Sequence, residues 1–297
     1  MPSAKEIKTR IASIQDTQKI TNAMYLISST KLRKARNELS RTRPYFEALQ
    51  GEIKRIFRTV PDVVSPYFYP PAGAPKLEGT YACLVITADR GMAGAYNHNV
   101  IKAAQAMLSA HPDTKLFVVG EYGRQHFLQS HTPIEQSFLY PAQNPTLHRA
   151  REICDVLLER YESGEFQKLY ILFTDMKSSL AAEPISTRLL PFHRGDFSSA
   201  DGAPGVSFEF TPSIGVVLSH VIQSYVTGFI YSALVDSFCA EQNARMTAMS
   251  SAGENADKML SALSIQYNRV RQASITQEIT EVAAGAKAQK RKRVQKC

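Results

Sequence analysis

Apolar and polar positions divide the chain into two long helical ends and a mixed central part. From Ser3 to Arg43 the sequence has neither glycine nor proline, which predicts an unbroken helix about 60 Å long. No proline follows Pro212, and the pattern predicts a second helix from Pro212 to about Ala284, about 110 Å long. A compact chain of this length has a radius of gyration of about 19 Å, so both helices are expected to project from it.

Local signals mark the ends of these helices. Ser3 and Glu6 have the spacing of a capping box, and Thr211 before Pro212 has the form of a cap followed by a proline at the first helical position. Pro44 is expected to kink or end the first helix, although residues 52–58 keep helical character.

The second helix carries a heptad seam, in which apolar or small residues follow alternating steps of three and four. The seam consists of Met246, Met249, Gly253, Ala256, Leu260, Leu263, Tyr267 and Val270. This pattern predicts coiled-coil packing against another helix. We therefore expect the two terminal helices to form an antiparallel coiled coil, with a globular domain inserted between them in the sequence.

The first helix has a less regular apolar face. Its lane of three- and four-residue steps is Ile7, Ile11, Ile14, Gln18, Thr21, Tyr25, Ser28, Leu32, Ala35 and Leu39. This lane is polar or small in the middle, where Ile20, Met24 and Ile27 lie on a neighbouring face. Together with the four bases in residues 31–36, the irregular face indicates contact with an acidic partner on several sides. Imperfect packing beside a solvated basic face is the alternative, and the pattern leaves both open.

The central part alternates between short β-rich runs and helical patterns. The runs YACLVITADRG, KLFVVGEYG and KLYILFTD are typical of strands, and NVIKAAQAMLSAH and TLHRAREICDVLLERYESG are typical of helices. This alternation predicts a parallel α/β domain with crossover helices at residues 76–195. The chain is thus predicted to consist of an N-terminal helix at 1–60, this domain, a C-terminal helix at 212–286 and a basic tail at 287–297.

The net charge of +8 is concentrated at the two ends of the chain. Residues 1–60 hold 13 Lys and Arg against 5 Asp and Glu, and residues 287–297 hold 6 bases and no acid. An acidic partner is therefore expected to meet the ends. Nucleic-acid binding is one alternative for the tail, although no nucleic-acid motif accompanies it. The other is that these bases complement the dipole of a helix C-terminus.

Composition places the chain among ordinary soluble proteins, with 44% hydrophobic and 21% charged residues. The N-terminal residues have no apolar core of a secretory signal, so a cytoplasmic location is expected. Polar residues interrupt the apolar stretch 214–238, which argues against a membrane span. Four cysteines, at positions 83, 154, 239 and 297, show no metal or disulfide spacing and are interpreted as small apolar residues.

Signals for catalysis are weak. Gly91 and Gly94 follow a predicted strand, but the loop matches neither common phosphate-binding motif. Asp89 and Arg90 are most simply a turn-forming pair, and no metal ligand set or cofactor motif is found. An α/β enzyme with coiled-coil docking arms remains the alternative to a protein whose role is mechanical or structural.

Several segments resemble the γ subunit of rotary F-type ATP synthases of the bacterial kind. They are IKTRIASIQDTQKITNAMYLISSTKLRKAR near the start, ITADRGMAGAYNHNV in the centre, and EQNARMTAMSSAGENADKM and ITQEITEVAAGAKA near the end. The resemblance implies an antiparallel coiled coil of the terminal helices and a central Rossmann-like domain. It also implies a central stalk that is not an enzyme itself and couples proton or sodium flow to conformational cycling of the catalytic β subunits.

The resemblance also implies partners and contact residues. The partners are the α and β subunits of the catalytic ring, the ε subunit and the ring of c subunits, at the cytoplasmic face of the plasma membrane. Met24, Lys31, Arg271, Gln272, Thr276 and Glu278 match positions that contact β subunits. Phe208, Glu209 and Phe210 match the region that contacts the c ring and ε. Tyr25 and Ala95 depart from the family pattern, as does the tail of residues 287–297.

Overall fold

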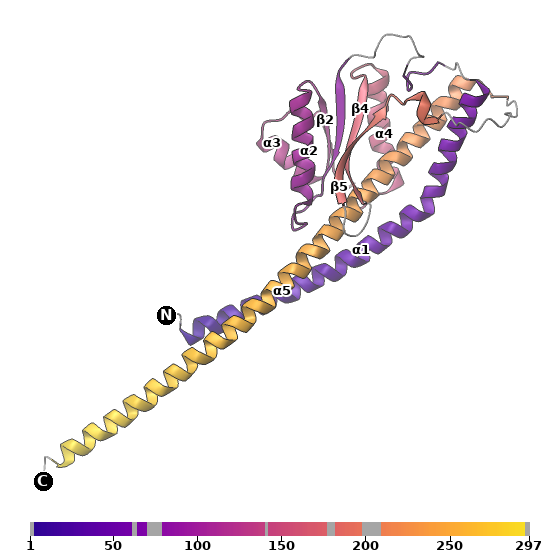
Figure 1. Ribbon diagram of the computed structural model, residues 1–297. Helices are drawn as coiled ribbons and strands as arrows, with labels where there is room; N and C mark the ends of the chain where they lie inside the picture. The colour runs from indigo at the N-terminus through magenta and orange to yellow at the C-terminus, as the bar shows by residue number, and fades with distance from the viewer. Residues whose placement is uncertain are drawn as a thin grey trace. The chain divides into compact units, whose positions relative to one another are not determined.

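The computed structural model describes residues 3–60, 64–69, 79–139, 142–176, 182–197 and 209–294 (Figure 1). Contacts divide the chain into two compact units. One unit comprises residues 1–27 and 247–297, and the other comprises residues 28–246. The long terminal helices α1 (Ala4–Thr59) and α5 (Ile214–Val294) each contribute to both units. With the strands and helices that lie between them in the sequence, they confirm the predicted fold class, α/β with long helices at both ends.

Helix α1 begins at the predicted capping box and continues past Pro44, where a kink or an end was expected. The amide of Ser3 donates to Glu6 Oε2 at 2.9 Å, and the amide of Glu6 donates to Ser3 Oγ at 3.2 Å. Pro44 lies inside the helix and does not end it. Ile53 and Ile56, beyond Pro44, are buried in the core, and this packing compensates for the backbone hydrogen bond that a proline cannot donate.

Helix α5 has 81 residues and begins two positions after the predicted start. The capping residue is Ser213, not Thr211, because Ser213 Oγ accepts a hydrogen bond from the amide of Val216 at 3.4 Å. An 18-residue window of α5 reaches a mean hydropathy of 1.4, enough by length and composition for a membrane span. Within the same helix, Ile222, Val226 and Ile230 are fully buried in the core of the protein.

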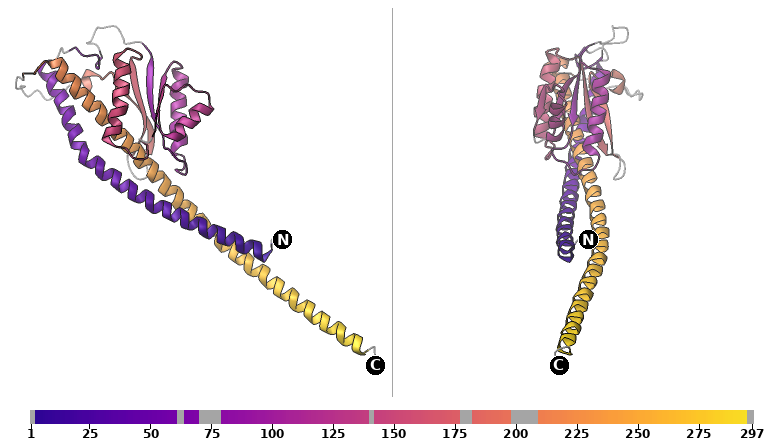
Figure 2. Two further views of the ribbon diagram at one scale, coloured as in Figure 1. Left: turned by 180° about the vertical axis from the view of Figure 1, so that it is seen from behind. Right: turned by 90° about the vertical axis from the view of Figure 1, so that its left-hand side faces the viewer.

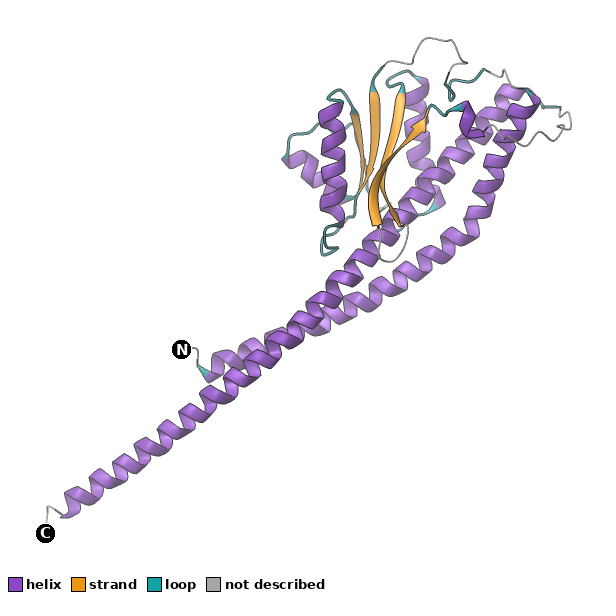
Figure 3. Ribbon diagram, in the orientation of Figure 1, coloured by secondary structure: helices purple, strands orange, loops and turns teal. Residues whose placement is uncertain are grey.

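The second unit contains a five-stranded sheet with the order β3-β2-β1-β4-β5 (Figure 3). The strands are β1 (Tyr81–Ile86), β2 (Lys115–Val119), β3 (Gln136–Phe138), β4 (Lys168–Met176) and β5 (Ala182–Leu190). The three predicted strands β1, β2 and β4 are parallel, as expected, and β3 is parallel to β2, whereas β5 is antiparallel to β4. The connection of residues 177–181 is too short for a crossover, which explains why the last strand reverses direction.

Helices cover both faces of this sheet (Figure 1). On one face lie α2 (Tyr96–Ala110) and α3 (Glu121–Gln129), and on the other lie α4 (Leu147–Glu162) and α5. A short 3-10 helix, Arg194–Phe197, follows β5. Alternate residues of β1 point to opposite faces, so Val85 packs with Val100 of α2 and Ile86 lies in the cluster that contains Ile153 of α4.

The first unit pairs the beginning of α1 with the second half of α5, which run antiparallel (Figure 2). Every predicted seam residue from Met249 to Val270 is buried or half-buried, which confirms the seam. Ile7 of α1 is buried, as its place in the predicted lane suggests. The lane contained Tyr25, but Tyr25 is exposed and its neighbour Met24 is half-buried instead. Ile20 and Ile27 are exposed, so the irregular apolar face of α1 is real.

Candidate functional site

The C-terminal part of α5 is an exposed helix with an apolar stripe. Ile275, Ile279 and Val282 are 47%, 64% and 74% exposed, and their spacing of four and three places them on one helix face. The heptad seam ends at Val270, since the next positions in its register are Ser274, Gln277 and Glu281. The stripe is therefore displaced from the seam and lies on a different side of α5.

The residues predicted to contact β subunits in this region surround that stripe. Arg271, Gln272, Thr276 and Glu278 are all exposed. Arg271, Ile275, Glu278 and Val282 follow steps of four, three and four, so both charges lie along the apolar stripe. Sequence reasoning missed the three apolar residues as site residues, although their helical spacing outside the seam was the available signal.

The predicted contact residues of α1 differ in exposure. Met24 is half-buried in the first unit, and Lys31 is exposed in the second. A groove of about 390 Å³ lies between α1 and α5 in the first unit, and its lining residues are Gln18, Lys19, Thr21, Asn22, Tyr25, Met249, Ser250, Gly253 and Asp257. Gln18 Nε2 donates to Asp257 Oδ1 at 2.7 Å, so a polar contact joins the two helices here.

The predicted contacts with the c ring and ε fall at the edge of the described chain. Phe208 lies outside the described residues, and Glu209 is exposed. Phe210 is half-buried and packs against the core of the second unit.

The place where a doubly wound domain normally binds a ligand is filled by α5. Such ligands bind beyond the carboxyl ends of strands where the strand order reverses, which is between β1 and β4 here. Ala88 and Tyr96, which follow β1, pack against Ala240 of α5. Ser237 Oγ of α5 accepts a hydrogen bond from the amide of Thr174 in β4 at 3.1 Å. This geometry argues against the enzyme alternative, because the protein's own helix occupies the crevice.

A buried ion pair holds the loop after β1 against α5. Arg245 contacts Glu241 Oε1 at 2.6 Å, and both side chains are less than a tenth exposed. The same guanidinium donates to the carbonyl oxygens of Gly91 and Arg90 at 3.0 and 3.4 Å. Sequence reasoning missed this pair, although a Glu and an Arg four residues apart in an apolar helix were the available signal.

Asp89 joins this loop to a distant helix, whereas the sequence indicated only a local turn. Asp89 Oδ1 accepts a hydrogen bond from the amide of Glu121 at 3.0 Å, which joins the loop to the start of α3. Asn97 Oδ1 accepts from the amide of Ala88 at 2.9 Å. Met92 has a positive φ of 61° and is exposed, so the fixed loop presents it outward.

Burial perturbs two carboxyl groups of α5. Burial raises the pKa of Glu241, and the charge of Arg245 opposes this change. Burial and then the negative charge of Asp175 raise the pKa of Asp236 to about 6, against the opposing charge of Arg43. Both groups lie where α5 packs on the second unit, so these shifts reflect its burial there.

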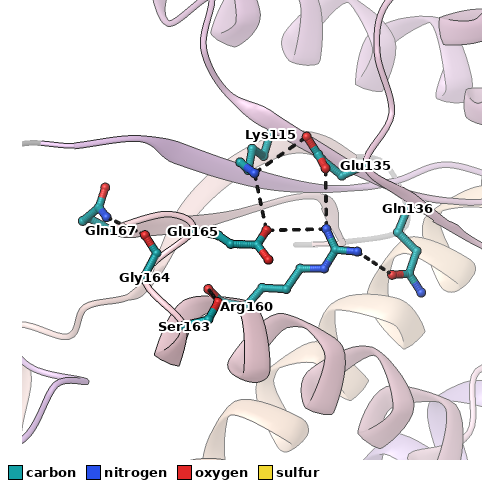
Figure 4. A network of polar contacts seen from close by, with 8 residues as sticks. All are labelled: Lys115, Glu135, Gln136, Arg160, Ser163, Gly164, Glu165 and Gln167. Carbon is teal, nitrogen blue, oxygen red and sulfur yellow. Dashed lines mark hydrogen bonds and ion pairs between the residues drawn. The ribbon is translucent and has the colours of Figure 1, made fainter.

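A second polar cluster lies at the opposite, amino-terminal edge of the sheet (Figure 4). Lys115 lies 3.9 Å from Glu135 and 3.4 Å from Glu165, and Arg160 lies 3.5 and 3.7 Å from the same carboxylates. Arg160 also donates to Gln136 Oε1 at 3.4 Å. Two bases and two acids balance one another. The cluster therefore joins α4 to the sheet and has no unbalanced charge for a ligand.

The cysteines within the described chain have the predicted character. Cys83, Cys154 and Cys239 are buried free thiols, and burial raises the pKa of each to about 12. Such thiols are unreactive, because the thiolate is the nucleophile and the ligand for metals.

Comparisons with known proteins give the family. A family model described as ATP synthase matches residues 3–289. The ATP synthase gamma chain of Acetivibrio thermocellus is 40% identical over 98% of this chain and 100% of its own length. That of Caldanaerobacter subterraneus subsp. tengcongensis is 38% identical over 95% of this chain and 98% of its own length.

Solved structures share the fold at low sequence identity. A chain of the Euglena gracilis mitochondrial ATP synthase, in a structure described as OSCP/F1/c-ring, gives a TM-score of 0.68 at 14% identity. The match covers 96% of this chain and 94% of that one. A chain from the central stalk and c-ring structure of the Tetrahymena thermophila enzyme gives 0.57 at 18% identity, over 78% and 99%. By the family model and the close relatives, this chain belongs to the ATP synthase gamma chain family.

Proposed function

We propose that this chain is the central stalk of an F-type ATP synthase and acts as its rotor. It catalyses nothing itself, and the complex synthesises ATP. Its partners are the α and β subunits of the catalytic ring, the ε subunit and the c-subunit ring. The complex is membrane-associated, and we place this subunit at the cytoplasmic face of the plasma membrane.

The observation that carries this proposal is the surface of α5. Burying the side chain of an isoleucine is worth about 1.5–3 kcal/mol, and the stripe of Ile275, Ile279 and Val282 gains only part of this in the isolated chain. An exposed helix of this kind derives its stability from contacts with other subunits. Enclosure by a ring of subunits supplies such contacts on several sides of the helix.

The predicted residues divide into three contact regions in this proposal. Arg271, Gln272, Thr276 and Glu278 contact a β-subunit loop beside the apolar stripe, with charges of both signs available to it. Met24 and Lys31 contact β subunits from α1, where the base suits an acidic loop. Phe208, Glu209 and Phe210 contact the c ring and ε. Phe210 acts chiefly by supporting this surface, since it packs on the core of its own unit.

Coupling follows from differential contact. An asymmetric stalk stabilises a different β-subunit conformation at each rotation angle, and it changes nucleotide affinity only by that difference in contact energy. The second unit passes torque to α5 because the sheet, the loop after β1 and α5 form one packed core. The Glu241–Arg245 pair fixes that loop to the helix.

Affinity purification of this chain from native membranes tests the proposal. We expect recovery of α, β, ε and c subunits, and no ATP hydrolysis by the isolated chain above a blank. In the assembled complex, R271A together with E278A is expected to reduce ion-coupled synthesis more than hydrolysis. Isolation of the chain without these subunits, or robust hydrolysis by the pure chain, would overturn the proposal.

A further inference from the structure

A second groove lies within the second unit, away from the exposed end of α5. It has a volume of about 520 Å³ and is formed by three helices. Its lining residues are Arg41, Thr42, Tyr45 and Phe46 of α1, Leu147 and Arg151 of α4, and Gln223, Ser224 and Thr227 of α5. We name it the α1–α4–α5 groove.

The floor of this groove is apolar and tightly fitted. Phe46 makes an edge contact with Tyr45, with ring centroids 5.4 Å apart, and a tilted contact with Tyr231 at 6.3 Å. The Phe46 ring lies directly on Gly228 of α5, where a Cβ atom would overlap it. Tyr45 remains 56% exposed, so the groove presents an aromatic surface that its own chain leaves largely uncovered.

The two arginines of the groove have guanidinium groups that are available to a partner. Within the described part of the chain, neither Arg41 nor Arg151 forms a salt bridge or a hydrogen bond. Asp155 follows Arg151 by four residues, but its Oδ1 accepts a hydrogen bond from Gln223 Nε2 at 3.0 Å instead. Asp155 therefore joins α4 to α5, and the hydrogen-bond donors of Arg151 remain available.

The hydroxyl groups of the groove are largely satisfied by the backbone. Thr227 Oγ1 donates to the carbonyl oxygen of Gln223 at 2.8 Å, and Thr42 Oγ1 donates to the carbonyls of Glu38 and Leu39 at 3.2 Å. The groove consequently offers guanidinium donors beside an aromatic floor. Arginine forms strong paired hydrogen bonds with carboxylates, and Arg and Tyr are enriched among the residues that dominate protein interfaces.

We propose that the α1–α4–α5 groove binds an acidic peptide segment of a partner subunit, which places an apolar side chain on Tyr45 and Phe46 and carboxylates on Arg41 and Arg151. Charge complementarity favours an acidic occupant. The exposed aromatic floor favours a peptide over a free phosphate, which would leave that floor uncovered. The proposal rests on the proposed function, since it requires the chain to assemble with partner subunits.

Photo-crosslinking in the purified complex tests this assignment. A benzophenone amino acid replaces Tyr45, and a matched variant carries it at Tyr122, an exposed tyrosine of α3 on the opposite face of the sheet. We expect the Tyr45 variant to crosslink to a partner segment that contains several Asp or Glu residues, identified by mass spectrometry. The Tyr122 variant is expected not to crosslink to that segment.

Charge variants make the test specific. R41E combined with R151E is expected to lower the crosslink yield by about tenfold or more, because two paired contacts become repulsive. R41K with R151K preserves the charge but not the paired hydrogen bonds, so its yield is expected to lie between those of the wild type and R41E/R151E. Reversal of the crosslinked acids to lysine should restore the yield in the R41E/R151E complex. K102E, on α2, is the control for a general change of charge.

The outcomes distinguish a failure of the groove proposal from a failure of the proposed function. If the chain recovers no partner subunits, the proposed function fails. If the complex assembles but Tyr45 crosslinks to nothing, or to a segment without acids, the groove proposal alone is overturned. It is also overturned if R41E/R151E leaves the yield unchanged, or if added inorganic phosphate or ADP abolishes the crosslink while the subunits stay assembled, since the groove would then be a small-anion site.

Discussion

One helix carries two surfaces of opposite character. Between residues 218 and 246, α5 is part of a core, and Ile222, Val226 and Ile230 are completely buried by the sheet, α4 and α1. Between residues 271 and 287 every residue is exposed, including Ile275, Ile279 and Val282. Isoleucine and valine side chains thus have different roles in the two regions. In the first region they stabilise the folded chain, and in the second they are available to other subunits.

The largest predicted difference uses one isoleucine from each region. I230A is expected to destabilise the chain by about 4 kcal/mol, because it opens a cavity in a fully packed core. I275A removes the same atoms from a half-exposed site and is expected to change stability by less than about 0.5 kcal/mol. Urea unfolding of the isolated chain measures both. Equal losses for the two variants would show that the two regions do not differ.

The buried ion pair gives the next largest effect. R245A is expected to cost about 3 kcal/mol, because it leaves Glu241 buried without its partner and frees the loop at Gly91. E241Q/R245Q removes both charges and should recover part of that loss. A double-mutant cycle from urea unfolding measures the coupling. A coupling energy near zero would mean that the pair does not hold the loop.

Asp236 makes the stability of the second unit depend on pH. Its pKa is raised from 3.8 to about 6. Between pH 3.8 and about pH 6, the folded state therefore keeps a proton that the unfolded chain has lost. Stability contributed by this group is therefore full below pH 3.8, falls as pH rises to about 6, and stays lost above it. D236N is expected to gain about 2 kcal/mol at pH 7 relative to wild type. The gain should disappear near pH 4, and a gain that is the same at both pH values would contradict the assignment.

The smallest effect concerns the exposed stripe. I279S is expected to leave the stability of the isolated chain unchanged. It is expected to weaken binding of the surrounding subunits to α5 by about 1 kcal/mol, because it removes apolar surface that they bury. The ratio of ion-driven synthesis to hydrolysis in the complex measures this loss. Q277S, an exposed change about half a turn away on the same helix, is the control. An equal drop for both variants would mean that the stripe has no special role.

The sequence predicted the elements whose signal is long and periodic. The heptad seam from Met246 to Val270 and the capping box at Ser3 were correct, because each depends on local spacing alone. The local pattern left open whether the helix at 1–60 breaks at Pro44, since its continuation depends on the burial of Ile53 and Ile56 by distant segments. The strand β3 and the helix α3 were missed for a similar reason, because short elements are defined by their tertiary contacts.

In the candidate site, too, features set by local spacing could be predicted and features set by tertiary contacts could not. Arg271 and Glu278 were predicted as contact residues from a resemblance, and their place along the apolar stripe can be read from their helical spacing. The filling of the crevice between β1 and β4 by α5 could not be predicted, because it brings Tyr96 against Ala240 across most of the central domain. That contact also explains why a domain of nucleotide-binding form has no ligand crevice at this place.

Hydrogen–deuterium exchange of residues 271–287 tests the central claim most directly. The account predicts fast exchange of these amides in the isolated chain and exchange slowed by at least about tenfold in the purified complex, where other subunits cover α5. Residues 222–238 should exchange slowly in both samples and serve as the internal reference. Equally fast exchange of residues 271–287 in the chain and in the complex would contradict the account.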